Sequence, residues 1–112
     1  MTKLEKHIVK LTAKWKKRLG LADWTLYTSF EKTRGDTTRA CVLERHWEYR
    51  YAVIEFYTDT CKNDEDLERH VVHELLHCVL AELESKRKKH EERVVVTLAD
   101  AFIHLAERDE KR

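Results

Sequence analysis

Residues 70–80, HVVHELLHCVL, place three histidines and a glutamate in a stretch that otherwise has the apolar composition of a buried helix. Polar groups in an apolar environment cost free energy unless a hydrogen bond, an ion pair or a metal compensates them. His73 and His77 stand four residues apart, so on a helix their imidazoles project from one face, one turn apart. The stretch therefore predicts a helix over about residues 65–83 whose polar groups need a metal or another compensating partner.

Residues 73–77 read His-Glu-Leu-Leu-His, the pattern HExxH. Two imidazole nitrogens at this spacing can bind one Zn2+ at about 2.0–2.1 Å each. Glu74 lies beside the first histidine without needing to bind the metal, where it suits a general base that takes a proton from metal-bound water. HExxH also occurs in unrelated sequences, so its apolar helical flanks carry part of the argument. We expect His73 and His77 to be zinc ligands and Glu74 to be the catalytic base.

Two neighbours of the motif resemble ligands by residue type alone. His70 lies on the face of His73 and His77 and could be a further ligand or a hydrogen-bond partner of one. Because HExxH sites draw their third ligand from elsewhere in the chain, we expect His70 to be a partly exposed helix residue. Cys78 points about 100° away from His77 on a helix, so we expect it to be a small core residue.

A catalytic zinc site also needs a third protein ligand and one open position. A last helix, predicted over about residues 90–107, begins with Glu91 and Glu92 ahead of an otherwise apolar surface. The connection before it, ESKRKK at residues 84–89, is short, so the helix should run roughly antiparallel to the HExxH helix. A glutamate near its start then faces the motif. Helical periodicity places Glu91 and Glu92 on different faces of this helix, and both faces are apolar. Periodicity alone therefore does not show which of the two is the third ligand.

The rest of the pattern predicts an α+β layout in one domain, residues 1–112. Apolar residues at helical spacing, with Gly20 as a stop, predict an N-terminal helix over residues 3–19. Alternating β-branched and aromatic residues predict a small antiparallel or mixed three-stranded sheet, with strands at about 24–30, 38–47 and 49–58. The HExxH helix, capped by Asn63 or Asp64, and the C-terminal helix follow.

The charge balance excludes some classes of partner. With 22 Lys+Arg against 21 Asp+Glu, the net charge of +1 gives no reason to expect nucleic acid or membrane partners. The basic N-terminal helix is most simply a solvated face. No run approaches the roughly 18 apolar residues of a membrane span, the first residues lack a signal-peptide pattern, and three widely spaced cysteines without CxxC favour reduced thiols. We expect a cytoplasmic location; the sequence sets no oligomeric state.

The HVVHELLHCVL stretch resembles the active-site helix of the zincin metallopeptidases. The helix after it is similar to that of the gluzincin branch, in which a glutamate on a following helix is the third zinc ligand, and the short chain resembles minimal single-domain gluzincin-like proteins of phage or prokaryotic type. The resemblance covers about residues 50–106. Residues 92–99, ERVVVTLA, resemble the family pattern Glu-x-x-small-x-x-apolar-Ala, which favours Glu92 over Glu91. The HxxGxxH continuation of metzincins is absent after His73.

The resemblance implies a zinc-dependent metallopeptidase that hydrolyses peptide bonds of a peptide or protein substrate through a metal-activated water. Its zinc ligands are His73, His77 and Glu92. It also implies that the strand at residues 49–58 is the edge strand that lines the cleft. The alternative is a zinc-stabilised binding or regulatory domain of the same fold without general protease activity. The group that stabilises the oxyanion stays open among Tyr49, Tyr51, Tyr57, His90 and His104.

Overall fold

The computed structural model describes residues 1–83 and 88–110; residues 84–87 of the predicted connection, and residues 111–112, lie outside the described part. It confirms the α+β layout of helix, three-stranded sheet, HExxH helix and C-terminal helix. The elements are α1 (Lys3–Arg18), β1 (Thr25–Glu31), β2 (Ala40–His46), β3 (Tyr51–Tyr57), α2 (Thr58–Cys61), α3 (Leu67–Val79), a 3-10 turn (Leu80–Leu83) and α4 (Lys88–Glu110). The short helix α2 was not predicted, and α3 passes into the 3-10 turn where the sequence predicted a continuous helix.

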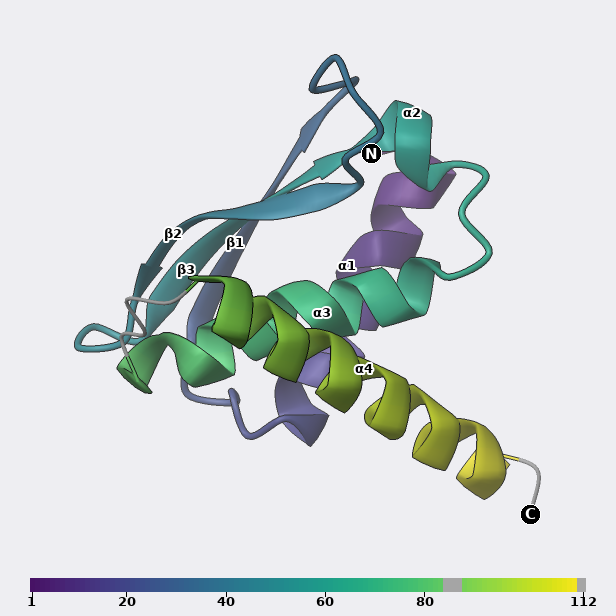
Figure 1. Cartoon of the computed structure of the whole chain (residues 1–112). Helices are drawn as coiled ribbons and strands as arrows, with labels where there is room; N and C mark the ends of the chain where they lie inside the picture. The colour runs from purple at the N-terminus through teal and green to yellow at the C-terminus, as the bar shows by residue number, and fades with distance from the viewer. Residues whose placement is uncertain (84–87, 111–112) are drawn as a thin grey trace.

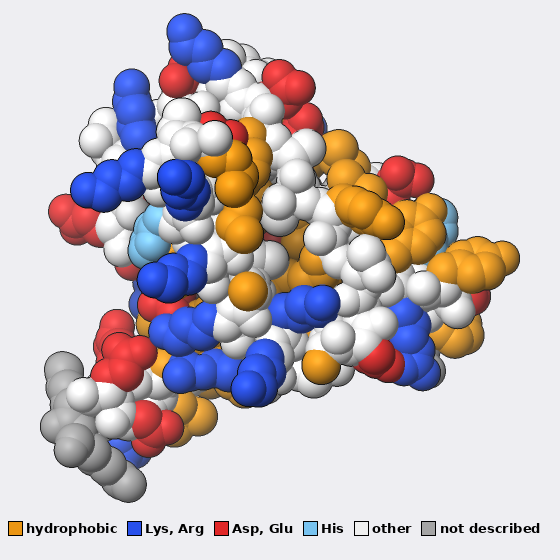
Figure 2. Space-filling model, turned by 180° about the vertical axis from the view of Figure 1, so that it is seen from behind, with side chains coloured by type: hydrophobic (Ala, Val, Ile, Leu, Met, Phe, Trp, Pro, Cys, Tyr) orange, Lys and Arg blue, Asp and Glu red, His pale blue; other side chains and the backbone are white. Residues whose placement is uncertain are grey.

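The first helix, α1, is fixed at both ends by local chemistry. Thr2 and Glu5 form a capping box at its start, which satisfies N–H groups that the helix leaves free. Gly20 follows its end with a φ of 75°, a conformation that suits glycine. One face of α1 buries Ile8 and Trp15. The opposite face carries exposed lysines, and Figure 2 shows Lys and Arg side chains gathered on this side of the molecule.

The sheet has the order β1-β3-β2, with β1 parallel and β2 antiparallel to β3. The expectation that the strand at residues 49–58 forms the edge along the cleft is therefore wrong, because β3 is the central strand. Its side chains Ala52, Ile54 and Phe56 are almost completely buried, and a central position lets both neighbouring strands shield them. The edge that faces the helices at the candidate site belongs to β2.

Helix α3 lies in the middle of the helical layer. Figure 1 shows α1, α3 and α4 on one side of the sheet, with α4 running back along α3 in roughly the opposite direction, as the short connection predicts. The apolar residues of α3 point into one core that also takes residues from α1, β3 and α4. Cys78 belongs to this core and is fully buried, as predicted.

The last helix, α4, contacts this core through a single stripe. Glu91, Val95, Ala99 and Ile103 recur every four residues and are all buried, whereas Val96 on the other side is exposed. The stripe begins with a buried carboxylate, so the first turn of α4 brings charge to the end of the core. None of the helices in the described part of the chain is long and apolar enough to cross a membrane.

Glu68 ties α1 to α3 and provides a test of this packing. Its Oε2 accepts hydrogen bonds from Lys14 Nζ at 2.8 Å and Trp15 Nε1 at 2.7 Å. Burial alone raises the pKa of Glu68, but these hydrogen bonds outweigh it and hold the pKa below the ordinary value of 4.5. A carboxyl whose pKa falls on folding stabilises the protein above its unfolded pKa, and that contribution is lost as the pH falls through the folded pKa.

We expect Glu68→Gln to lower the free energy of unfolding by about 0.5–1 kcal/mol at neutral pH, since the group is partly exposed and screened by solvent. The difference from wild type should shrink as the pH falls below 4.5, the ordinary pKa. Urea denaturation of metal-free protein at several pH values measures both effects. Glu110→Gln is the control, because Glu110 also contacts Lys14 but at 3.4 Å and in an exposed position. A difference that persists unchanged in acid would contradict the role of the charge.

Candidate metal centre

The structure brings His73, His77 and Glu92 together between α3 and the N-terminal part of α4. Glu92 Oε1 lies 2.5 Å from His73 Nε2, and Glu92 Oε2 lies 3.1 Å from His77 Nε2. One ligand atom from each residue lies within 4.8 Å of the others. Two imidazoles and one carboxylate are a donor set that catalytic zinc sites use, and three protein ligands leave one position open. The residues present therefore fit a zinc ion.

The two adjacent glutamates occupy different places around His77. Glu92 reaches Nε2, whereas Glu91 Oε1 lies 2.8 Å from Nδ1, at the other edge of the same ring. Glu91 is only 7% exposed, while the Glu92 side chain is 50% exposed. The difference follows from the rotation of about 100° per residue along a helix, which turns Glu91 into the core and Glu92 toward the rim. Glu92 thus joins the ligand cluster and Glu91 supports it from behind.

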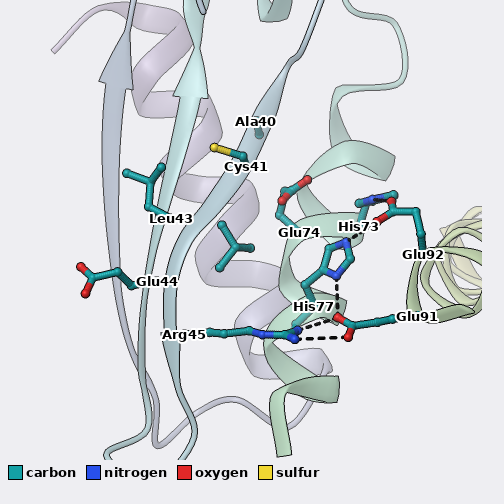
Figure 3. A pocket seen from close by; sticks show the side chains of 11 residues that line it. Ala40, Cys41, Leu43, Glu44, Arg45, His73, Glu74, His77, Glu91 and Glu92 are labelled. Carbon is teal, nitrogen blue, oxygen red and sulfur yellow. Dashed lines mark hydrogen bonds and ion pairs between the residues drawn. The ribbon is translucent and has the colours of Figure 1, made fainter. Parts of the chain in front are cut away.

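Arg45 completes the arrangement, and the sequence analysis did not find it. Its guanidinium lies 2.5 and 3.2 Å from the two oxygens of Glu91, and Nη1 also donates to the carbonyl oxygen of His77 at 2.6 Å. This ion pair, more than burial, sets the protonation of Glu91: the hydrogen bonds from Arg45 hold the pKa of Glu91 below its ordinary range. Figure 3 shows Arg45 reaching from β2 to Glu91 beneath His77. The sequence around Arg45 predicts only a strand, and nothing in it indicates a contact with a glutamate 46 residues away.

Glu74 lies beside the cluster as the HExxH pattern predicts. It is 9% exposed and lines the same cavity as the ligand residues. Burial, and to a smaller extent the negative charge of Glu92, raises the pKa of Glu74 to about 8. A carboxyl group with a pKa near neutrality can both accept and release a proton, which is the requirement for a general base that later acts as an acid. A nearby cation would lower this pKa again.

The environment of His73 also suits metal binding. Burial lowers the pKa of His73, and the carboxylate of Glu92 offsets that effect only in part. A neutral imidazole keeps a nitrogen lone pair, which is the form that a metal binds. The rings of His73 and His77 stand with their centres 5.1 Å apart, one turn from each other on α3. The helix thus presents both nitrogens to the same region of space.

A cavity of about 550 Å³ opens over these residues, between the edge of β2, α3 and α4. It is lined by Ala40, Cys41, Val42, Leu43, Glu44, Arg45, His73, Glu74, His77, Glu91 and Glu92. A second cavity of about 280 Å³ shares Ala40, His73 and Glu74 with it and continues toward Thr37. The two form a groove that follows the edge of β2, and Figure 3 shows the site residues of α3 facing this strand.

His70 lies outside the ligand cluster, in agreement with its expected place as a partly exposed residue. Its Nδ1 is 2.6 Å from Asp64 Oδ2. The prediction that Asn63 or Asp64 caps α3 is wrong: the cap position is Asp66, and Asp64 instead accepts the backbone N–H of Asp66 and pairs with Arg39. The buried Asp64 therefore links the start of β2 to α3 at the far end of the groove.

Four of the five candidate oxyanion groups are absent from the lining of the main cavity. None of the tyrosines is among the residues that line the main cavity, nor is His104. The hydroxyl of Tyr57 instead donates to Glu55 on the outer face of the sheet, at 2.9 Å. The side chain of His90 lies outside the described part of the structure. Among the described residues that line the cavity, Arg45 is the cationic side chain.

No protein-family model, curated protein or solved structure matches this chain. The resemblance to the zincins consequently rests on the HExxH helix, the glutamate on the following helix and the order of the elements.

We expect the purified protein to bind about one equivalent of Zn2+, and Glu92→Ala to weaken binding by more than the roughly 10–100-fold that loss of an outer hydrogen-bond partner costs. Competition with a chromophoric chelator measures the affinity. Glu107→Ala, an exposed substitution on the same helix, should bind zinc as wild type does. Equal affinities for Glu92→Ala and wild type would remove Glu92 from the ligand set.

Proposed function

We propose that this protein is a zinc-dependent metallopeptidase, with His73, His77 and Glu92 as the zinc ligands. The observation that carries the proposal is the position of the Glu92 carboxylate, which bridges the Nε2 atoms of both HExxH histidines. This arrangement gathers one ligand atom from each of the three residues within 4.8 Å of the others. Two supporting observations are the buried Glu74 beside the cluster and the groove above it.

The chain's own residues divide the work of hydrolysis. Zinc, when bound, supplies a Lewis acid that lowers the pKa of a water molecule and polarises the peptide carbonyl. Glu74 takes the proton of the attacking water and delivers it to the leaving amine, and its buried position beside the ligand cluster suits both steps. Glu91 and Arg45 hold His77 from the side opposite the ligand cluster. Val42 and Ala40 form the apolar wall of the groove.

The proposed substrate is an extended peptide that lies along β2. This strand pairs with β3 on one side only, so the backbone groups of its other edge are available to a further strand. A peptide bound in this way gains main-chain hydrogen bonds whatever its sequence, and the groove receives alternate side chains. The sequence predicted that the strand at residues 49–58 would bind the peptide, and we now propose β2 for this role. The peptide is still expected to bind as an added strand.

We also propose that the protein works in a reducing compartment such as the cytoplasm. Cys41, Cys61 and Cys78 are all free thiols, and two of them are buried in the core. A buried thiol in a small domain behaves as an apolar side chain rather than as half of a disulfide.

We expect Glu74→Gln to abolish peptide hydrolysis, with a fall of roughly 10²–10⁴-fold in rate, because an amide cannot take the proton. Zinc should stay bound, since Glu74 is not one of the three proposed ligands. A fluorogenic peptide library measures the first effect and metal analysis the second. Glu107→Gln is the control for the surface charge. A Glu74→Gln protein with wild-type activity would overturn the mechanism, and loss of zinc would make Glu74 a ligand.

A zinc-stabilised binding domain without general protease activity is the second candidate. It is favoured by the way the cluster joins α3 and α4, since a metal on His73, His77 and Glu92 would hold these two helices together. The ion pair between Arg45 and Glu91 links β2 to the same place. A chelator should then lower the unfolding temperature strongly while no peptide in a library is cleaved. Cleavage that the chelator stops and added Zn2+ restores would favour the peptidase.

A further inference from the structure

The β2 strand contains an irregularity at the point where it passes the candidate site. Val42 pairs with Ile54 of β3, but the next pair is Glu44 with Val53, so Leu43 is an extra residue. Such a β-bulge changes the alternation of side chains on the strand that contains it. If Leu43 paired regularly with Val53, Val42 and Glu44 would face the helices and Arg45 would point away. With the bulge, Glu44 turns outward and Arg45, paired with the buried Ala52, faces the helices.

Figure 3 shows the result of this change. Leu43 and Glu44 lie on the side of β2 away from α3, whereas Arg45 extends under His77 to Glu91. Leu43 is 51% exposed, so the extra residue contributes little to the core. Because Leu43 is skipped in the pairing, Arg45 lies opposite Ala52 rather than Tyr51 and therefore faces the helices.

The contacts of Arg45 converge on one metal-ligand candidate from two directions. It holds both oxygens of Glu91, and it also donates to the backbone carbonyl of His77. Glu91 Oε1 in turn contacts His77 Nδ1. A carboxylate can only accept hydrogen bonds, so Glu91 favours a proton on Nδ1. Nε2, which lies 3.1 Å from Glu92, is then the nitrogen whose lone pair a metal in the cluster would take.

The charges explain why Glu91 needs Arg45. Glu91 is almost completely buried, and burying a carboxylate is strongly unfavourable unless a cation is paired with it. A planar guanidinium that binds both oxygens fixes the carboxylate more firmly than an ammonium does.

We infer that Arg45 is a positioning residue for the metal centre: the bulge at Leu43 directs it onto Glu91, and Glu91 fixes the tautomer and the ring of His77. The inference rests on the proposed metal site. It assigns to β2 a second role besides substrate binding, because the strand that lines the groove also sets the orientation of a ligand.

The test compares Arg45→Met with wild type by titration of metal-free protein with Co2+, which reports affinity and, through its visible absorption, coordination geometry. We expect Arg45→Met to bind Co2+ roughly 10–100-fold more weakly and to change the absorption spectrum. Arg45→Lys should restore the affinity only in part, because it keeps the charge but not the two-pronged contact.

Arg39→Met is the matched control. Arg39 lies just before β2, and its ion pair is with a buried carboxylate outside the ligand cluster, that of Asp64, at 3.0 Å. It should bind Co2+ with wild-type affinity and spectrum. Wild-type binding by Arg45→Met, equal losses in Arg39→Met and Arg45→Met, or full restoration by Arg45→Lys would overturn the inference. Failure of the wild-type protein to bind Co2+ or Zn2+ would instead overturn the proposed function. If Arg45→Met does not fold, the Arg45→Lys spectrum decides.

Discussion

The structure depends on a narrow polar strip on an otherwise apolar helix. The residues of α3 that surround the strip are buried in the core from several sides, so the helix cannot turn His73, Glu74 and His77 into bulk solvent. These groups must find partners where they are, and the fold supplies them from α4 and β2. The first residues of α4 meet this requirement, while Val95, Ala99 and Ile103 pack the rest of the helix against the core.

Two neighbouring carboxylates meet the requirement in different ways. Glu92 stands at the rim, half exposed, and reaches the Nε2 atoms that a metal would use. Glu91 is buried and is neutralised by Arg45, so it adds a hydrogen-bond acceptor behind His77 without an uncompensated charge. In the proposed site Glu92 would bind the metal and Glu91 would orient the ligand His77. Two consecutive residues can have these different roles because a helix turns by about 100° between them.

The sheet contributes an edge and an irregularity. The most apolar strand, β3, lies at the centre, which leaves the more polar β2 at the edge beside α3. That edge supports the proposed binding of an extended peptide, and the bulge within it brings Arg45 into the site. In a small domain, one strand can serve both purposes because alternate positions face the helices and the open side of the sheet.

The sequence by itself determined the order of the elements, the HExxH face of α3 and the presence of a glutamate opposite it, because helical periodicity and short connections are local properties. It narrowed the third ligand to Glu91 and Glu92, and only the resemblance to the gluzincins favoured Glu92. The tertiary structure decided the order of the strands, the places of Glu91 and Glu92 around His77, and the entry of Arg45. Strand order depends on which faces are buried together, and a bulge depends on the register of two strands distant in sequence. Neither is encoded in the spacing of residues along one segment.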